Sequence, residues 1–396
     1  MQSVYLDHAA TTPVAPTVLE AMLPYFSQVH GNASSRSHAY GWAAAQAVDG
    51  ARVQLAELLD VHPGELTFTS GSTEAINLAL KGIAHRYRRR GRHIVTAATE
   101  HRAVLDSCAH LAAAGYEVTC LRPDAAGRID PAAVATSLRD DTVLVALMWA
   151  NNETGVLLDV AAVGEACAAR DVLFFSDATQ AVGKLEVHPR EVGVHALALS
   201  AHKFYGPKGV GALWVSAAEP RVAVAEQQHG GGHEGGIRSG TLNVPGIVGL
   251  GAAAALAADE MHTSQRRLTR LRDRLEARLL RQLDAVLING GGAPRLGHLS
   301  NFSPRFTEAE ALLSSFQRQL ALSTGSACSS ADLEPSHVLL AMGLDPRDAK
   351  AAVRVSLGRD TTAEHVELAA RLIVGGVRRL REASPTWELH LDGVLP

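Results

Sequence analysis

Short apolar segments alternate with helical patterns over the first half of the chain, and this alternation is the feature that most constrains the fold. Alternation of this kind is typical of a mostly parallel sheet that helices cover on both faces and that binds ligands at the carboxyl ends of its strands. We therefore predict an α/β fold. The predicted strands are Leu66–Thr69, His93–Ala97, Glu117–Leu121, Thr142–Met148, Val172–Ser176, Ala196–Leu199 and Ala212–Val215.

The character of the sequence changes near Asp259, where a long charged helix begins. Its leucines recur at helical spacing and arginines fill the other positions, which favours a solvated helix face over a surface for an acidic partner. We predict that this helix leads into a smaller C-terminal α/β domain. The predicted domains are residues 15–258, and residues 1–14 together with 259–396.

One lysine, Lys203, directly follows the predicted strand Ala196–Leu199 and has Ser200, His202 and a glycine-rich turn as neighbours. A lysine at the end of a buried strand is placed as a Schiff-base nucleophile would be, because rigid backbone positions it and desolvation favours loss of its proton. Taken alone, this segment is more typical of an ordinary surface lysine before a turn.

An aspartate, Asp177, follows the preceding apolar strand in the same way. An aspartate in this position can pair with the pyridinium nitrogen of a pyridoxal cofactor, although a helix N-cap would explain the residue alone. The ordered pair of Asp177 and Lys203 is more specific than either residue.

A phosphate site is predicted where the strand Leu66–Thr69 meets a helical pattern at Ser72 and Thr73. Backbone N–H groups at a helix N-terminus, with two hydroxyls beside them, would bind a dianion. A helix capped by serine or threonine, without a ligand, is the alternative.

The chain resembles the cysteine desulfurases, which are fold-type I pyridoxal-phosphate enzymes of the aminotransferase class V group. The resemblance covers nearly the whole chain. Its motifs are Tyr5–Pro13, Gly31–Ser35, Thr99–His101, Met148–Gly155, the Lys203 segment, Arg238–Pro245, Thr324–Ser330 and Arg354–Arg359.

The resemblance implies a large domain with a seven-stranded sheet, and pyridoxal 5'-phosphate as the cofactor. It implies that Lys203 holds the cofactor, Asp177 pairs with the ring nitrogen, Gln180 hydrogen-bonds the phenolic oxygen and His101 stacks on the ring. The residues implied for the phosphate are Thr73, Ser200 and His202, with Thr241 from the partner subunit of a homodimer. Those implied for the substrate carboxylate are Asn152 and Arg354, and Asn152 is also implied to contact the cofactor.

Cys328 would carry the distinctive chemistry. Its neighbours are small and polar, so the segment predicts a mobile exposed loop. A thiolate there could take sulfur from the bound substrate as a persulfide and deliver it elsewhere. The other cysteines, Cys108, Cys120 and Cys167, lie in apolar or helical patterns and are predicted to be small buried side chains.

Composition is consistent with a soluble cytoplasmic protein. The chain has 396 residues, of which 47% are hydrophobic and 20% charged, with a net charge of −4, so a nucleic-acid partner is not expected. Four cysteines without C-x-x-C spacing indicate neither a disulfide framework nor a metal site. The sequence shows no export signal and no apolar run of about twenty residues, so we expect no membrane association.

Three hypotheses about function follow. The first is an L-cysteine desulfurase that makes L-alanine and supplies sulfur, through an acceptor protein such as a scaffold or sulfurtransferase, to iron–sulfur cluster assembly or to thio-cofactor or tRNA thiolation. The second is selenocysteine lysis or another reaction on a small amino acid with the same cofactor. The third is a non-catalytic interaction protein that kept the fold.

Overall fold

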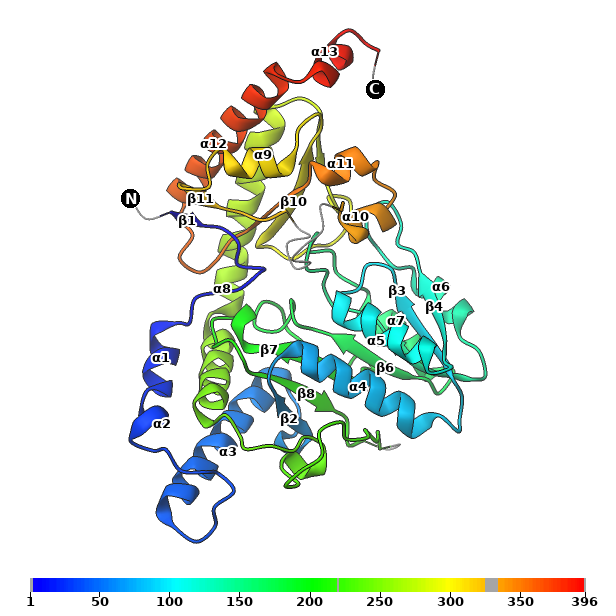
Figure 1. The fold of residues 1–396 in the computed structure, drawn as a ribbon, viewed down its shortest axis with the longest axis vertical. Helices are drawn as coiled ribbons and strands as arrows, with labels where there is room; N and C mark the ends of the chain where they lie inside the picture. The colour runs from blue at the N-terminus through cyan, green and yellow to red at the C-terminus, as the bar shows by residue number, and fades with distance from the viewer. Residues whose placement is uncertain (1–2, 219–220, 325–333, 395–396) are drawn as a thin grey trace.

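The computed structural model describes residues 3–218, 221–324 and 334–394. Its largest element is a seven-stranded sheet with the order β2-β8-β7-β6-β5-β3-β4 (Figure 1). β8 runs antiparallel to β2 and to β7, and the other four strand pairs are parallel, so the predicted mostly parallel α/β sheet is confirmed. The strands are β2 (Leu66–Thr69), β3 (His93–Ala97), β4 (Glu117–Leu121), β5 (Thr142–Ala146), β6 (Leu173–Asp177), β7 (Ala196–Ser200) and β8 (Gly211–Val215).

The strands β2, β3 and β4 have the predicted bounds, whereas the bounds of β5, β6, β7 and β8 differ from the prediction by one or two residues. β5 ends at Ala146, two residues before the predicted end at Met148. β6 is shifted by one residue and includes Asp177, which therefore lies inside the sheet at its carboxyl edge.

Helices cover both faces of this sheet. Successive residues of a strand point to opposite faces, so each strand contributes side chains to a hydrophobic core on either side. In β6, Phe174 packs in one hydrophobic core with α3 (Ala39–Leu59) and the first half of α8 (Val244–Gln282). Its neighbour Phe175 packs in another with α4 (Ser72–Tyr87) and α5 (Arg102–Ala113). Burial on both sides explains why the strands are continuously apolar.

Helix α8 is longer than the sequence predicted. The apolar segment before Asp259 and the charged segment after it form one helix of 39 residues, Val244–Gln282. It is the one helix in the described ranges long and apolar enough to cross a membrane, but 56% of its most apolar window is buried in the protein, as in the core helix of a soluble protein. Figure 1 shows α8 running from the large sheet into the C-terminal part of the molecule.

The C-terminal part has its own hydrophobic core, which includes Leu275 of α8, Phe302, Val355 and Ile373. Its sheet is antiparallel in the order β12-β10-β9, and a parallel pair joins β1 to β11. The separate core supports a small domain, whereas the predicted boundary at residue 258 falls inside a continuous helix, so the division stays a prediction. The elements are β1 (Val4–Tyr5), β9 (Val286–Ile288), β10 (Leu299–Pro304), β11 (Leu320–Ala321), β12 (Val353–Ser356) and α12 (Ala363–Glu382).

Short helices complete the structure. They are α1 (Pro16–Met22), α2 (Pro24–Ser27), α6 (Pro131–Ser137), α7 (Val160–Ala168), α9 (Ala309–Ser314), α10 (His337–Ala341), α11 (Pro346–Lys350) and α13 (Pro385–Leu391), with 3-10 turns η1 (Pro63–Glu65), η2 (Ala201–Lys203) and η3 (Glu234–Gly236).

The cysteine prediction was right for two residues and wrong for one. Cys108 and Cys167 are buried, and burial raises the pKa of each thiol to about 12. Cys120 is exposed, because β4 is an edge strand and pairs only with β3 within the sheet. Cys328 lies outside the described residues.

Gly211 allows a close approach between β8, β7 and the loop before α4. A Cβ on Gly211 would lie 2.4 Å from the Leu199 carbonyl oxygen and 2.8 Å from the backbone of Gly71. We expect Gly211→Ala to lower the free energy of unfolding by roughly 1–3 kcal/mol, because backbone atoms must move. Gly50→Ala is the matched control, since nothing lies within 4 Å of its Cβ position in the helix α3. Chemical denaturation measures both; equal stability of the two variants would contradict this role for Gly211.

Candidate active site

The two residues that carry the prediction, Asp177 and Lys203, lie at the same edge of the large sheet. Asp177 ends β6, and β7 ends at Ser200, immediately before the 3-10 turn that contains Lys203. The two strands are parallel neighbours, with Asp177 paired with Ala198. The sheet therefore brings the carboxylate and the amine together at its carboxyl edge.

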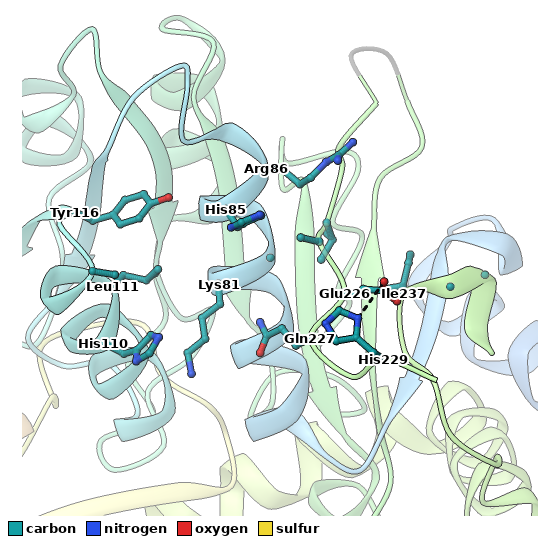
Figure 2. Close-up of a pocket in the computed structure, with 16 residues that line it drawn as sticks. Lys81, His85, Arg86, His110, Leu111, Tyr116, Glu226, Gln227, His229 and Ile237 are labelled. Atoms are coloured by element: carbon teal, nitrogen blue, oxygen red, sulfur yellow. Dashed lines mark ion pairs between the residues drawn. The ribbon is translucent and has the colours of Figure 1, made fainter. Parts of the chain in front are cut away.

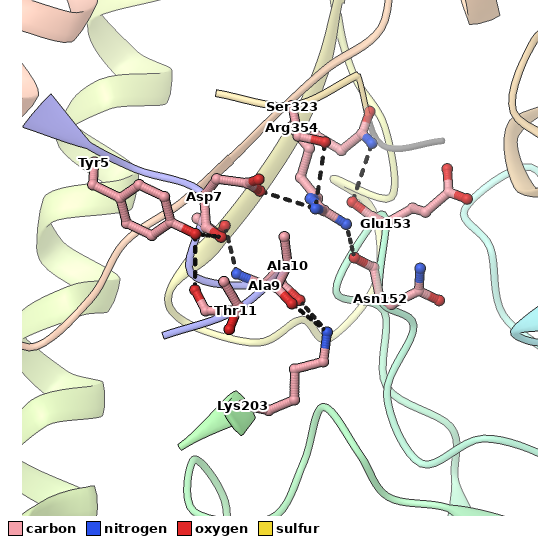
Figure 3. A network of polar contacts seen from close by, with 12 residues as sticks. Tyr5, Asp7, Ala9, Ala10, Thr11, Asn152, Glu153, Lys203, Ser323 and Arg354 are labelled. Atoms are coloured by element: carbon pink, nitrogen blue, oxygen red, sulfur yellow. Dashed lines mark hydrogen bonds and ion pairs between the residues drawn. The ribbon is translucent and has the colours of Figure 1, made fainter. Parts of the chain in front are cut away.

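The Lys203 amine contacts the N-terminal segment of the chain. Its Nζ donates hydrogen bonds to the carbonyl oxygens of Ala9 and Ala10, each at 2.8 Å (Figure 3). Thr12 holds the same loop, because its N–H donates to the His202 carbonyl at 2.9 Å and its Oγ1 accepts from the Tyr205 N–H at 2.8 Å. Residues 9–12 thus form one wall of the site. Sequence analysis noted this segment only as a motif and missed the contact.

Asp177 is 6% exposed, and its own turn holds the carboxylate. Oδ1 accepts from the Thr179 N–H at 3.0 Å and from the Thr179 hydroxyl. Gln180 follows in the same turn, and its Nε2 donates to the Ala9 carbonyl at 2.9 Å. The predicted partner of the ring nitrogen, Asp177, therefore ends β6, and the predicted partner of the phenolic oxygen, Gln180, lies in the turn that follows.

The predicted phosphate residues gather at the start of α4. Ser72 and Thr73 begin this helix after Gly71, whose φ of 150° suits glycine. Ser200 comes close from β7, with its Oγ 3.7 Å from the Cβ position of Gly71. N–H groups at the start of a helix and three hydroxyl-bearing residues make a cradle that fits a phosphate.

His202 lies beside this cradle, and its Nδ1 is 3.1 Å from the Thr11 hydroxyl. Burial, together with the positive charges of Lys203, Lys208 and Lys184, lowers the pKa of His202 to about 4. The ring is therefore neutral near pH 7 and would act through hydrogen bonding.

His101 is the N-cap of α5, where its Nδ1 accepts from the Ala103 N–H at 3.1 Å. Because Nδ1 accepts, the neutral ring carries its proton on Nε2. This contact fixes both the position and the tautomer of a histidine that was predicted to stack on the cofactor.

Glu100 is a buried acid at the site that sequence analysis did not assign. Its Oε1 accepts from the Met148 N–H at 2.8 Å. Burial raises the pKa of Glu100 well above its usual range, and the negative charge of Asp177 adds to the shift. Both effects favour the uncharged acid next to Asp177. An acidic residue between Thr99 and His101, directly after an apolar strand, was the available signal.

Arg354 on β12 is 1% exposed, and protein groups contact both of its Nη atoms. Nη1 donates to the Asn152 carbonyl at 2.9 Å, and Nη2 pairs with Asp7 Oδ1 at 3.0 Å (Figure 3). Within the described residues, Arg354 Nε is buried without a hydrogen-bond partner. Arg354 and Asn152 therefore lie in contact, through the Asn152 backbone carbonyl. Their binding of a substrate carboxylate stays a prediction.

Arg354→Lys should keep the charge at this position and lose the planar fork. We expect kcat/KM for L-cysteine to fall roughly 5- to 150-fold, which corresponds to a loss of about 1–3 kcal/mol in transition-state binding. Arg347→Lys is the control, because Arg347 pairs with Asp345 on the exposed surface, where an ion pair contributes little. Unchanged kcat/KM in Arg354→Lys would remove this residue from the site.

Thr241 is exposed in the segment between η3 and α8, consistent with its assignment to a partner subunit's site. Cys328 lies outside the described residues.

A wide cleft of about 1020 Å³ lies elsewhere, between α4, α5 and the segment 224–237 (Figure 2). Lys81, His85, Arg86 and His110 line it, and Glu226 pairs with His229 at 3.1 Å on the opposite side. Within the described part of the chain, no predicted site residue lines this cleft. Its size alone therefore does not make it the active site.

Comparison with known proteins gives the family. The profile of the aminotransferase class-V family matches residues 4–368. A cysteine desulfurase IscS from Anaeromyxobacter dehalogenans is 50% identical over 391 residues, which cover 99% of this chain and 96% of that protein. A solved NifS-like protein superimposes with a TM-score of 0.88 at 32% identity, covering 96% of this chain and 100% of that one. SspA in complex with cysteine gives a TM-score of 0.78 at 33% identity, covering 89% and 98%. With this fold and this arrangement of Lys203 and Asp177, the chain belongs to the cysteine desulfurases of the aminotransferase class-V family.

Proposed function

We propose that this chain binds pyridoxal 5'-phosphate at Lys203 and converts L-cysteine to L-alanine, with transfer of the sulfur to Cys328. The observation that carries the proposal is the meeting of Lys203 and Asp177 at the carboxyl edge of β6 and β7. When bound, the cofactor supplies an electron sink for bonds that break at the amino acid.

The residues of the site fit this cofactor. A buried carboxylate, Asp177, suits a protonated ring nitrogen, and the start of α4 suits a phosphate. These two groups lie on either side of the strand β7 that leads to Lys203. Gln180 Nε2 suits an oxygen acceptor such as the phenolic oxygen.

The protein groups would hold the substrate and move protons. Arg354 would bind the carboxylate, and His101, with its tautomer fixed by the α5 N-cap, would face the ring and exchange a proton at Nε2. In the sulfur transfer, the C–S bond of L-cysteine breaks, an S–S bond to the Cys328 thiolate forms, and the carbon that lost sulfur receives a proton. The products are L-alanine and the Cys328 persulfide.

The assembly and the acceptor are also part of this proposal. We place the chain in the cytoplasm as a homodimer in which Thr241 reaches the partner subunit's phosphate site. The persulfide would pass to an acceptor protein and supply sulfur for iron–sulfur clusters or other thiolation. Relatives named IscS favour iron–sulfur cluster assembly as the destination.

The purified protein, reconstituted with pyridoxal phosphate, tests the proposal. We expect L-cysteine and a reducing thiol to give L-alanine and sulfide in equal amounts. Production of alanine only from L-selenocysteine would favour the lyase alternative. Absence of both reactions from a protein that binds the cofactor would overturn the proposed function.

A further inference from the structure

Lys184, one of the five lysines of the chain, is buried and contacts Gln180 of the candidate site. It is 7% exposed, and its Nζ donates to Gln180 Oε1 at 2.9 Å. Consecutive turns after Asp177 place the two side chains on the same side, since the Val182 N–H bonds to the Ala178 carbonyl and the Leu185 N–H to the Ala181 carbonyl.

The Gln180 amide is held from both ends. Its Oε1 faces an amine that donates, and its Nε2 faces the Ala9 carbonyl, which can only accept. A flipped amide would place Nε2 against the Lys184 amine and Oε1 against the Ala9 oxygen, and both contacts would be lost. Both the ammonium and the neutral amine of Lys184 carry N–H groups for this contact.

We propose that Lys184 is a positioning residue that fixes the Gln180 amide with Nε2 toward the cofactor's phenolic oxygen. The inference rests on the proposed function, because it needs the cofactor at Lys203. Its consequence is that Lys184, without touching the cofactor, sets how strongly Gln180 stabilises the phenolate.

The charged form of Lys184 is energetically unfavourable in this environment. Burial lowers the pKa of Lys184 well below its usual range, and the charges of Lys203 and Arg354 lower it further. On its other side is a cavity of about 40 Å³, into which His8 and His298 face. Within the described structure, His8 Nδ1 and both ring nitrogens of His298 have no hydrogen-bond partner.

Other charged groups surround this region. The ones that act on Lys184, His8 or His298, or line the cavity, are Lys203, Arg272, Arg354, Asp360 and Glu260, the last of which pairs with Arg359. A lysine that is buried among other positive charges and has Gln180 as its hydrogen-bond acceptor is consistent with a role at the site.

Two quantities are measured in Lys184→Met. The first is the pH midpoint of the absorbance change of the bound cofactor, and the second is the dissociation constant of pyridoxal phosphate after reconstitution of the apo-protein. We expect the midpoint to rise by about 0.5–1 pH unit, the size of one neutral hydrogen bond, and the dissociation constant to rise about three- to tenfold. Lys184→Arg should keep the wild-type midpoint, because it retains a donor and the adjacent cavity gives room. Lys350→Met, an exposed lysine of α11, is the matched control.

A double variant shows whether Lys184 acts through Gln180. In a Gln180→Ala background, Lys184→Met should cause no further shift of the midpoint. If Lys184→Met fails to fold, Lys184→Gln, which is one bond too short for the 2.9 Å contact, must show the same upward shift.

A wild-type midpoint in Lys184→Met or in Lys184→Gln, or a shift that persists in the Gln180→Ala background, would overturn the positioning role alone. Failure of the wild-type and Lys350→Met proteins to bind pyridoxal phosphate would overturn the proposed function, and this inference with it.

Discussion

Lys203→Ala is expected to abolish turnover of L-cysteine, with a loss of roughly three orders of magnitude or more, because the residue that would bind the cofactor covalently is removed. The wild-type protein should be yellow, and borohydride should fix the mass of the cofactor on the peptide that contains Lys203. In Lys203→Ala that adduct should be absent. Absorbance, peptide mass spectrometry and an alanine assay measure the three results.

Lys208→Ala is the control for this prediction, since Lys208 is an exposed lysine on the same loop. It should keep the colour, the adduct and the activity. A wild-type protein that stays colourless after incubation with pyridoxal phosphate, or an adduct on a peptide without Lys203, would sink the assignment.

The second large effect is expected from Cys328→Ser, which separates cofactor chemistry from sulfur transfer. Binding of L-cysteine at Lys203 needs no protein thiol, so the absorbance should still change when the substrate is added. A serine hydroxyl is hardly ionised near neutral pH and is a poor acceptor of sulfur. Alanine formation should therefore fall at least about a hundredfold, and the protein should carry no persulfide.

The structure supplies the control for that experiment. Cys108 and Cys167 are buried, with pKa values of about 12, so neither is a thiolate near neutral pH. Cys120 is exposed on the edge strand, and Cys120→Ser should keep full activity. A wild-type rate of alanine release in Cys328→Ser, or a persulfide that maps to Cys120, would contradict the proposed transfer. L-Selenocysteine that is still processed by Cys328→Ser would show that the thiol is needed for sulfur specifically.

Much of the fold and part of the site could be predicted because they depend on local pattern. The strands β2, β3 and β4 have the predicted bounds. β2 and β3 are buried along their whole length, as a short apolar segment predicts, whereas β4 is partly exposed. The meeting of Asp177 and Lys203 followed from the rule that parallel strands present their carboxyl ends at one edge. The Cys120 prediction failed because an apolar neighbourhood does not say which strand lies at the edge of the sheet.

The sequence by itself determined the alternating strands and helices, the order of the motifs and the side chains proposed as reactive. Only the tertiary structure decided which distant groups hold them. Ala9 lies 194 residues from Lys203, and Asp7 lies 347 residues from Arg354. The N-terminal segment must dock against the turn after β7 for the first contact and against β12 for the second. Periodicity reports which residues of an element are buried, whereas the partner of a buried polar atom, such as Gln180 for Lys184, depends on how the turns and layers pack in three dimensions.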